Sequence, residues 1–250
     1  MPACRHLPLR ESWQIQLSSP PRPPFLPAGM YEADGFDTPG STVAALHRSL
    51  RGRFVVCYID AGTWENWRPD AAAFPKRLLG RADAGWPGER WLDIAAFRGA
   101  LARIMQARAS ICRRKGFDAV DFDNVDAYSN GTGFPLTAAD QLAYDSFLAD
   151  TAHRLGLAVA LKNDVPQVRE LLPYFDFAVE EQCLQYADCL TSQNGGQPGL
   201  DAFVAAGQPV FDVEYQPGSA ARFCTTASRD HFNLIIKDSA LDAWRQACPR

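Results

Sequence analysis

The sequence predicts an α/β protein folded as a single (β/α)8 TIM barrel, and three observations support this fold class. Short runs rich in β-branched and aromatic residues alternate with stretches of helical period, which is typical of parallel strands covered by helices. Eight such runs can be counted, and the 250 residues match the size of one barrel, about 250 residues. Polar residues, mostly acidic, follow nearly every run, where a barrel enzyme carries its active site.

The eight expected strands share an apolar centre and end at a polar residue or a turn. They cover residues 13–17, 30–35, 53–60, 119–123, 158–162, 177–181, 209–214 and 233–237. We assign residues 13–250 to the barrel domain and residues 1–12 to an N-terminal extension. No second domain is expected.

Six of the remaining stretches have the period of an amphipathic helix. They cover residues 42–50, 94–115, 137–155, 165–174, 200–206 and 239–247. In the third of them, Thr137 with Asp140 three residues later predicts an N-cap. After the first strand, the proline-rich segment 18–27 replaces a helix, because proline breaks helical hydrogen bonding.

A long segment after the third strand, residues 62–92, is rich in tryptophan, proline and glycine. Its place after a strand puts it over the active-site end of the barrel. Trp64 and its neighbours could stack on the apolar faces of sugar rings. They could equally pack only to hold the segment together.

Composition and charge exclude several classes of partner. A net charge of −4 and a pI near 5.6 argue against a nucleic acid or an anionic membrane surface, because either would require a basic patch. No run approaches the roughly 20 apolar residues of a membrane span. The sequence has no phosphate-binding glycine loop and no zinc motif, so we expect no cofactor and no metal. The charge is compatible with a neutral or cationic substrate, and we expect a monomer.

The seven cysteines bear on the compartment. Cys183 with Cys189, and Cys224 with Cys248, have spacings that could close as disulfides where conditions are oxidising. Buried, reduced cysteines are an equal alternative. An odd number leaves at least one thiol unpaired, most readily Cys4. No signal peptide is visible, yet the cysteines favour a secreted, extracellular or periplasmic protein.

Carboxylates dominate the chemistry available at the strand ends. None of the four histidines ends an expected strand, which disfavours a histidine triad or a zinc site. Two carboxyl groups suffice for glycosidic cleavage, since one protonates the leaving oxygen and the other attacks the sugar or activates water. The strongest candidates are Asp121, Asp123, Glu180 and Glu181. Alternate strand residues share a face, so Asp121 and Asp123 should both point inward, with Asp123 nearer the substrate.

Other polar strand-end residues have both a substrate-binding and a structural interpretation. The expected substrate-binding residues are Asp60, Trp64, Asp121, Asn124, Lys162, Asn163, Glu180, Glu214 and Tyr215. Asp60 could instead cap the turn before Gly62, and Lys162 could neutralise the acidic interior. Asn163 could cap the helix that follows. For Glu214 both interpretations stay open.

These motifs resemble glycoside hydrolase family 114, the endo-α-1,4-polygalactosaminidases. The similar motifs are CYIDAGTWENWRPD at residues 57–70, GFDAVDFDNVD at 116–126, LKND at 161–164 and EQC at 181–183. GFPLT at 133–137 and VEY at 213–215 are also in register. The similarity runs from about residue 13 to residue 250.

The resemblance implies a (β/α)8 barrel, generally secreted, that acts on partly deacetylated, cationic galactosamine polymers. It implies Asp123 and Glu181 as the two catalytic carboxylates, which agrees with the strand-end pattern. Two features depart from the family. Its usual Asn-Glu-Gln-Cys begins here with Glu180, which puts an extra acid beside Glu181, and the second strand is less regular.

Two other functions stay open. The same acids and tryptophans could hold a polysaccharide without cutting it, in a non-catalytic binding barrel. Alternatively, Asp60, Asp121, Asp123 and Glu181 could be the oxygen ligands of Mg²⁺ in a lyase or aldolase-type barrel. Turnover of the polymer, as opposed to mere retention, would exclude the non-catalytic barrel. Insensitivity of the activity to a chelator would exclude the Mg²⁺-dependent barrel.

Overall fold

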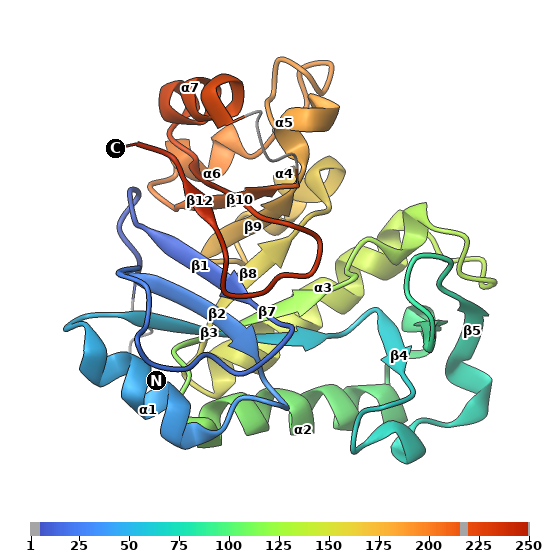
Figure 1. Ribbon diagram of the computed structural model, residues 1–250. Helices are drawn as coiled ribbons and strands as arrows, with labels where there is room; N and C mark the ends of the chain where they lie inside the picture. Colours follow the sequence, from blue (N-terminus) through green and yellow to red (C-terminus); the bar gives the residue numbers. More distant parts are fainter. Residues whose placement is uncertain (1–5, 216–219, 250) are drawn as a thin grey trace.

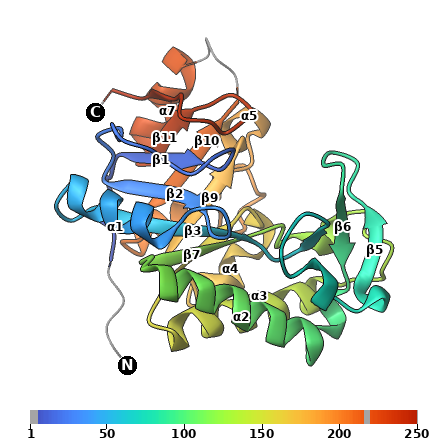
Figure 2. The same ribbon diagram turned by 60° about the horizontal axis from the view of Figure 1, so that its bottom comes forward.

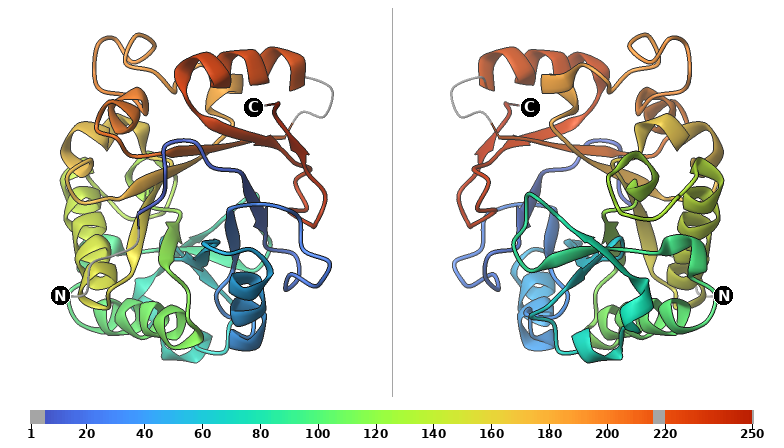
Figure 3. Two further views of the ribbon diagram at one scale, coloured as in Figure 1. Left: turned by 90° about the vertical axis from the view of Figure 1, so that its left-hand side faces the viewer. Right: turned by 90° about the vertical axis from the view of Figure 1, so that its right-hand side faces the viewer.

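The computed structural model describes residues 6–215 and 220–249. Eight parallel strands follow one another around a curled sheet, and a ninth, antiparallel strand lies at its end (Figure 1, Figure 3). The parallel strands are β1 (Trp13–Gln16), β2 (Met30–Asp34), β3 (Phe54–Asp60), β7 (Ala119–Asp123), β8 (Ala158–Lys162), β9 (Phe177–Glu181), β10 (Val210–Glu214) and β11 (Asn233–Ile236). All eight expected strands are confirmed, each within one residue of its expected bounds.

The inner face of the sheet carries a compact aromatic core. Trp13, Phe54, Phe177 and Phe211 point inward and are buried. Phe177 meets Phe54 and Phe211 edge to face, with ring centroids 6.2 and 5.9 Å apart. The outer face packs its alternate residues against the helices. Residues that continue the inward alternation therefore emerge above this core at the carboxyl ends of the strands.

Helices cover the outer face of the sheet (Figure 1, Figure 3). Those that overlap expected stretches are α1 (Gly40–Ser49), α2 (Ala100–Lys115), α3 (Ala138–Arg154), α4 (Val168–Leu171) and α6 (Asp201–Ala205). Thr137 caps α3 as expected, and Asp140 completes a reciprocal capping box. The stretch 94–115 is not one helix, because Gly99 has a φ of +118° between a short 3₁₀ turn, η3 (Ile94–Ala96), and α2.

The helix expected over residues 239–247 is wrong. Most of this segment is irregular, and it ends in β12 (Gln246–Ala247), which pairs antiparallel with β11. The buried Lys237 ammonium group donates to the carbonyls of Asp242 and Trp244, at 2.5 and 2.6 Å, so these carbonyls face it instead of bonding within a helix. Two helices were not expected: α5 (Cys183–Tyr186) and α7 (Ala220–Asp230).

The carboxyl-terminal segment lies along the seam between the first and last parallel strands. In the described part of the chain, the hydrogen-bonded strand order ends at β1 on one side and β12 on the other. The indole of Trp13 donates to the carbonyl of Asn233 at 2.7 Å, so β1 and β11 approach at their amino ends. Higher up, the amide of Leu17 donates to the carbonyl of Leu241 at 2.9 Å. The curled parallel sheet is thus confirmed, whereas a continuous main-chain ladder around all eight strands is not.

The tryptophan-rich segment forms a small structure of its own beside the sheet (Figure 2). Three short antiparallel strands, β4 (Thr63–Glu65), β5 (Leu79–Ala82) and β6 (Glu89–Leu92), pair in the order β4-β6-β5. Two 3₁₀ turns, η1 (Ala71–Ala73) and η2 (Lys76–Leu78), connect β4 to β5. Because this sheet follows β3 directly, it builds one wall above the carboxyl ends of the parallel strands.

Three disulfides link the described residues. Both expected bridges are confirmed: Cys183–Cys189 and Cys224–Cys248 have Cα separations of 5.0 and 5.3 Å. A third bridge, Cys57–Cys112, joins β3 to α2 across 55 residues of sequence and was not expected. Cys4 lies outside the described residues. No helix in the described ranges is both long enough and apolar enough to cross a membrane.

Candidate active site

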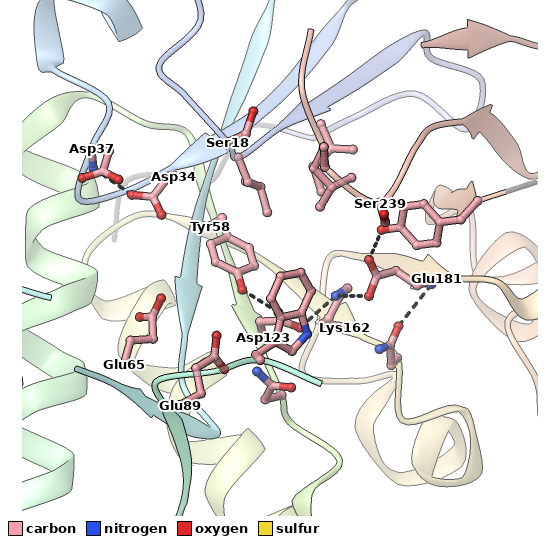
Figure 4. A pocket seen from close by; sticks show the side chains of 18 of the residues that line it. Ser18, Asp34, Asp37, Tyr58, Glu65, Glu89, Asp123, Lys162, Glu181 and Ser239 are labelled. Carbon is pink, nitrogen blue, oxygen red and sulfur yellow. Dashed lines mark hydrogen bonds and ion pairs between the residues drawn. The ribbon is translucent and has the colours of Figure 1, made fainter. Parts of the chain in front are cut away.

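A cavity of about 620 Å³ opens at the carboxyl ends of the parallel strands (Figure 4). Three inward-facing side chains from consecutive strands meet in it: Asp123 from β7, Lys162 from β8 and Glu181 from β9. The Lys162 ammonium lies 2.8 Å from a carboxylate oxygen of Asp123 and 3.0 Å from one of Glu181. The structure thus brings together the two residues expected to be catalytic and bridges them with a cation.

Two tyrosines complete the hydrogen bonding of these carboxylates. The Tyr58 hydroxyl donates to Asp123 at 2.6 Å, and the Tyr215 hydroxyl donates to Glu181. Burial acts to raise the pKa of Asp123, but the Lys162 charge and hydrogen bonds from Lys162 and Tyr58 outweigh it and hold that pKa below its usual value. Asp123 is therefore an ionised carboxylate held by two donors.

Lys162 is charged for the complementary reason. Burial alone acts to lower its pKa, but the neighbouring Asp123, Glu181 and Asp121 raise that pKa well above its usual value. Its side chain is only 3% exposed. Asn163 lies beside it on the cavity wall, and its side-chain oxygen accepts from the backbone amide of Glu181 at 3.2 Å. Lys162 and Asn163 thus fix the position of Glu181 from two directions.

Asp60 and Asn124 were both expected to bind substrate, and of the two only Asn124 lines the cavity. Asp60 is buried, does not line the cavity, and accepts from the backbone amide of Thr63 at 2.7 Å. Its structural interpretation, as a cap on the turn at Gly62, therefore agrees with the contacts. Asn124 lines the cavity and donates to Asp60 at 2.9 Å. Gly62 is required here, since a Cβ would lie 1.7 Å from the carbonyl oxygen of Asn124.

Glu180 and Glu214 were expected to contact substrate, and the structure places both outside the cavity. Side chains alternate along a strand, so Glu180 faces the outer side of the sheet while Glu181 faces the cavity. There Glu180 is buried and interacts with Asp212 on β10. Glu214 accepts hydrogen bonds from the backbone amides of Leu184 and Gln185 at 2.8 and 3.0 Å, so it caps α5.

The tryptophans that reach the cavity are not the one we selected. Trp64 is half-buried, and its indole donates to the carbonyl of Ala71 at 3.0 Å without lining the cavity. Trp67 and Trp86 line the cavity and are 51% and 58% exposed. Both belong to the tryptophan-rich segment, which therefore reaches the cavity through Trp67 and Trp86. Asp121 also lies outside the cavity, fully buried beneath Asp123.

One wall of the cavity is acidic, and the residues that form it were not among those selected from the strand ends. Asp34, Asp37, Glu65 and Glu89 gather on one side of Asp123 (Figure 4). Arg68 neutralises part of this charge, with ion pairs of 2.7 Å to Asp34 and 2.6 Å to Glu65. The opposite wall is mostly apolar or hydroxyl-bearing and is formed by Ile15, Leu17, Ser18, Ser239, Ala240 and Leu241.

The acids do not form a convincing magnesium site. Asp60, Glu65 and Glu89 have oxygens within 4.8 Å of one another. However, the Thr63 hydroxyl contacts both Asp60 and Glu89, and Arg68 occupies Glu65. The lyase alternative used Asp60, Asp121, Asp123 and Glu181, of which two do not line the cavity and two already bind the Lys162 ammonium.

A curled parallel sheet that presents two adjacent carboxylates and exposed tryptophans in one cavity defines the class of the protein: it is a glycoside hydrolase. Residues 3–250 match the model of glycoside-hydrolase family GH114, and the chain belongs to that family. The resemblance seen in the sequence motifs is therefore confirmed.

Comparison with known proteins agrees with this assignment. The crystal structure of Aspergillus fumigatus Ega3 in complex with galactosamine is similar, with 34% identity, 99% of each chain covered and a TM-score of 0.89. The glycoside hydrolase domain of PelA from Pseudomonas aeruginosa shares the fold at 16% identity, with 94% of this chain and 98% of that chain covered and a TM-score of 0.71. An uncharacterised protein of Deinococcus radiodurans is 26% identical over 204 residues, which span 76% of this chain and 65% of that protein.

Proposed function

We propose that this protein is an endo-acting hydrolase that cleaves α-1,4 linkages in a partly deacetylated galactosamine polymer. The observation that carries the proposal is the Asp123–Lys162–Glu181 cluster at the centre of the cavity. Membership of family GH114 and similarity to a protein crystallised with galactosamine support the choice of substrate. An uncharged sugar polymer would not require the acidic wall of the cavity.

The two carboxylates have different surroundings that suggest different roles. Asp123 is the less exposed, at 17% against 27% for the Glu181 side chain, and its pKa is lowered. An ionised, shielded carboxylate suits attack on the anomeric carbon. Glu181 suits proton transfer, since it is more open to water and its partner Tyr215 carries a hydroxyl that can donate or accept.

The spacing of the carboxylates favours retention of configuration. Both bind the same ammonium nitrogen, so their nearest oxygens lie within about 6 Å of each other. Retaining enzymes hold their carboxyls about 5–5.5 Å apart, whereas inverting enzymes leave about 6.5–9.5 Å for a water. We therefore assign Glu181 to protonate the leaving oxygen while Asp123 forms the glycosyl–enzyme bond. Water, deprotonated by Glu181, then breaks that bond and restores both carboxyls.

The walls of the cavity suit a cationic sugar chain. The free amines of deacetylated galactosamine are positively charged near neutral pH, and the wall of Asp34, Asp37, Glu65 and Glu89 offers more negative charge than Arg68 neutralises. Trp67 and Trp86 provide exposed rings on which sugar faces can stack. These features support binding of several units along the chain, as an endo-acting enzyme requires.

Location and assembly follow as parts of the same proposal. Three disulfides are typical of an oxidising compartment, so we place the enzyme outside the cytoplasm. We propose that the curled sheet functions as a closed (β/α)8 barrel, because residues 241–247 fill the seam between β11 and β1. We expect it to act as a monomer, since one chain supplies every wall of the cavity.

The direct test is incubation of the protein with partly deacetylated galactosamine polymer and mass spectrometry of the products. We expect oligosaccharides of several lengths, and proton NMR should show the α anomer forming first if configuration is retained. Retention of intact polymer, without new ends, would favour the non-catalytic alternative. Release of single sugars only would contradict endo action.

A further inference from the structure

Beneath the cavity lies a pair of acids that the proposed reaction does not use. Glu32 on β2 and Asp121 on β7 both face the interior of the curled sheet and are fully buried. β3 separates their strands, with Tyr58 in register with Asp121 and Val56 in register with Glu32. Each lies two residues before a cavity-lining aspartate, Asp34 and Asp123, so the pair occupies the layer directly below the site.

The hydrogen bonding of the pair is incomplete unless it holds a proton. Among the described residues, no other group donates to any of the four carboxyl oxygens of Glu32 and Asp121. Each carboxyl acts on the charge of the other, and the two are within reach of a hydrogen bond once one of them carries a proton. Two buried carboxylates cannot both remain ionised at such a contact, whereas a carboxylic acid can donate to a carboxylate. A proton between them satisfies both groups.

We infer that Glu32 and Asp121 form a carboxylic acid–carboxylate pair that shares one proton. The negative charge of this pair acts on the charged groups of the site above it. The inference rests on the proposed function, because the groups it acts on are Asp123, Lys162 and Glu181. Neither member lines the cavity, so both are positioning residues rather than catalytic ones.

The charges that face the pair come from three strands. Lys162 on β8 favours ionisation, while Asp123 on β7 disfavours it; Glu181 on β9 acts on Asp121 in the same sense as Asp123. Burial is the largest influence: it raises the pKa of Asp121 to about 7 and that of Glu32 well above its usual value. As pH rises through about 7, the pair therefore passes from two protons to one and gains one negative charge.

This single charge has a defined effect on the reaction. A negative charge below the site opposes the build-up of further negative charge in the cavity above it, so it favours the proton-loaded form of the site. At the same time the charge balances Lys162 from below, opposite Asp123 and Glu181. The charge of the pair therefore extends the proton-loaded, active form of the site toward higher pH.

Three substitutions separate this role from a packing role. Glu32→Gln and Asp121→Asn each replace the shared proton with an amide donor and keep one carboxylate, so each should retain the alkaline limb of the kcat/KM profile. The double variant Glu32→Gln/Asp121→Asn keeps the volume and the internal hydrogen bond but removes the charge. In this double variant the alkaline limb of the kcat/KM profile should move to lower pH by about one unit, because the lost charge lies two strand residues below the site. Its kcat at acid pH should stay near that of wild type.

A second measurement does not depend on activity. At mildly alkaline pH, infrared difference spectra of wild type minus each single variant should show a protonated carboxylic acid band that the variant has lost. Absence of that band in both difference spectra would overturn the shared proton. An unchanged pH profile in the folded double variant would overturn the effect on the site. If wild type cleaves no polymer while the band is present, the proposed function fails and the proton-sharing pair stands.

Discussion

Glu180 and Glu181 are neighbours in the sequence and lie in different environments. Glu181 faces the cavity, where Lys162 and Tyr215 bind it. Glu180 faces the outer layer, where it is buried beside Asp212. The difference arises only from the alternation of side chains along β9. It teaches that a carboxylate at a strand end belongs to the active site only if its side chain points to the inner face of the sheet. The same rule separates Asp123 from Glu214.

The largest expected effect tests that difference directly. Asp123→Asn removes the nucleophile and Glu181→Gln the acid–base group, so each should lower kcat by about 10²–10⁴-fold or more. Glu180→Gln, an identical chemical change one residue away, should leave kcat near that of wild type. Initial rates on the polymer, with circular dichroism as a check on folding, measure this. Comparable losses in Glu180→Gln and Glu181→Gln would show that parity does not decide the role.

A smaller effect compares two tryptophans of the same segment. Trp67→Ala removes an exposed ring at the cavity and should raise KM by about 3–10-fold, since a stacked ring contributes about 0.5–1.5 kcal/mol. Trp64→Ala removes a half-buried ring that bonds to Ala71, so it should lower the melting temperature more than it raises KM. Steady-state kinetics and thermal unfolding of both variants separate the roles. A larger KM effect from Trp64 would reverse our assignment.

The outer acids should show themselves in the pH dependence of stability. Burial raises the pKa of Glu180 and Asp212 well above their usual values, so the folded protein keeps protons that the unfolded chain releases. Their stabilising effect is complete below the unfolded pKa of a carboxyl and declines as pH rises, by about 1.4 kcal/mol per pH unit for each group that is protonated only in the folded state. Glu180→Gln should flatten this decline between pH about 5 and 8. Urea unfolding of wild type and of Glu180→Gln across that range measures this. An equal dependence of the unfolding free energy on pH in the two proteins would contradict the prediction.

The smallest expected effect concerns salt. Exposed charges are screened over about 8 Å at physiological ionic strength, so KM for the cationic polymer should rise a few-fold with added salt while kcat holds. Asp37→Asn, on the acidic wall, should weaken that dependence. Glu180→Asn should not, because Glu180 is buried on the outer side of the sheet. Fully acetylated polymer serves as the uncharged control, and an equal salt response from it would exclude the electrostatic account.

Local patterns predicted the elements of this fold well, and long-range pairing set the limit. Eight apolar runs and the Thr137 cap depend on near neighbours in sequence and were correctly placed. The segment 239–247 was misassigned because its conformation is dictated by Lys237 and by β1, more than 200 residues away in the case of Leu17. The Cys57–Cys112 bridge was missed for the same reason.

For the site, the alternation of side chains separates what could be predicted from what could not. Asp123, Lys162 and Glu181 share inward parity at consecutive strand ends, which the sequence contains. Glu180 and Glu214 were included because acidity was weighed without parity. The acidic wall depends on Arg68, which follows β4, reaching Asp34 at the end of β2, and spacing along the chain carries no signal of that.

The seam couples the shape of the cavity to the closure of the sheet. Residues 239–241 line the cavity, and the carbonyl of Leu241 accepts the amide of Leu17, just after β1. The wall that these residues form is therefore in place only when segments more than 200 positions apart in the sequence have met. Any substitution that loosens this contact should open the sugar cavity along with the seam.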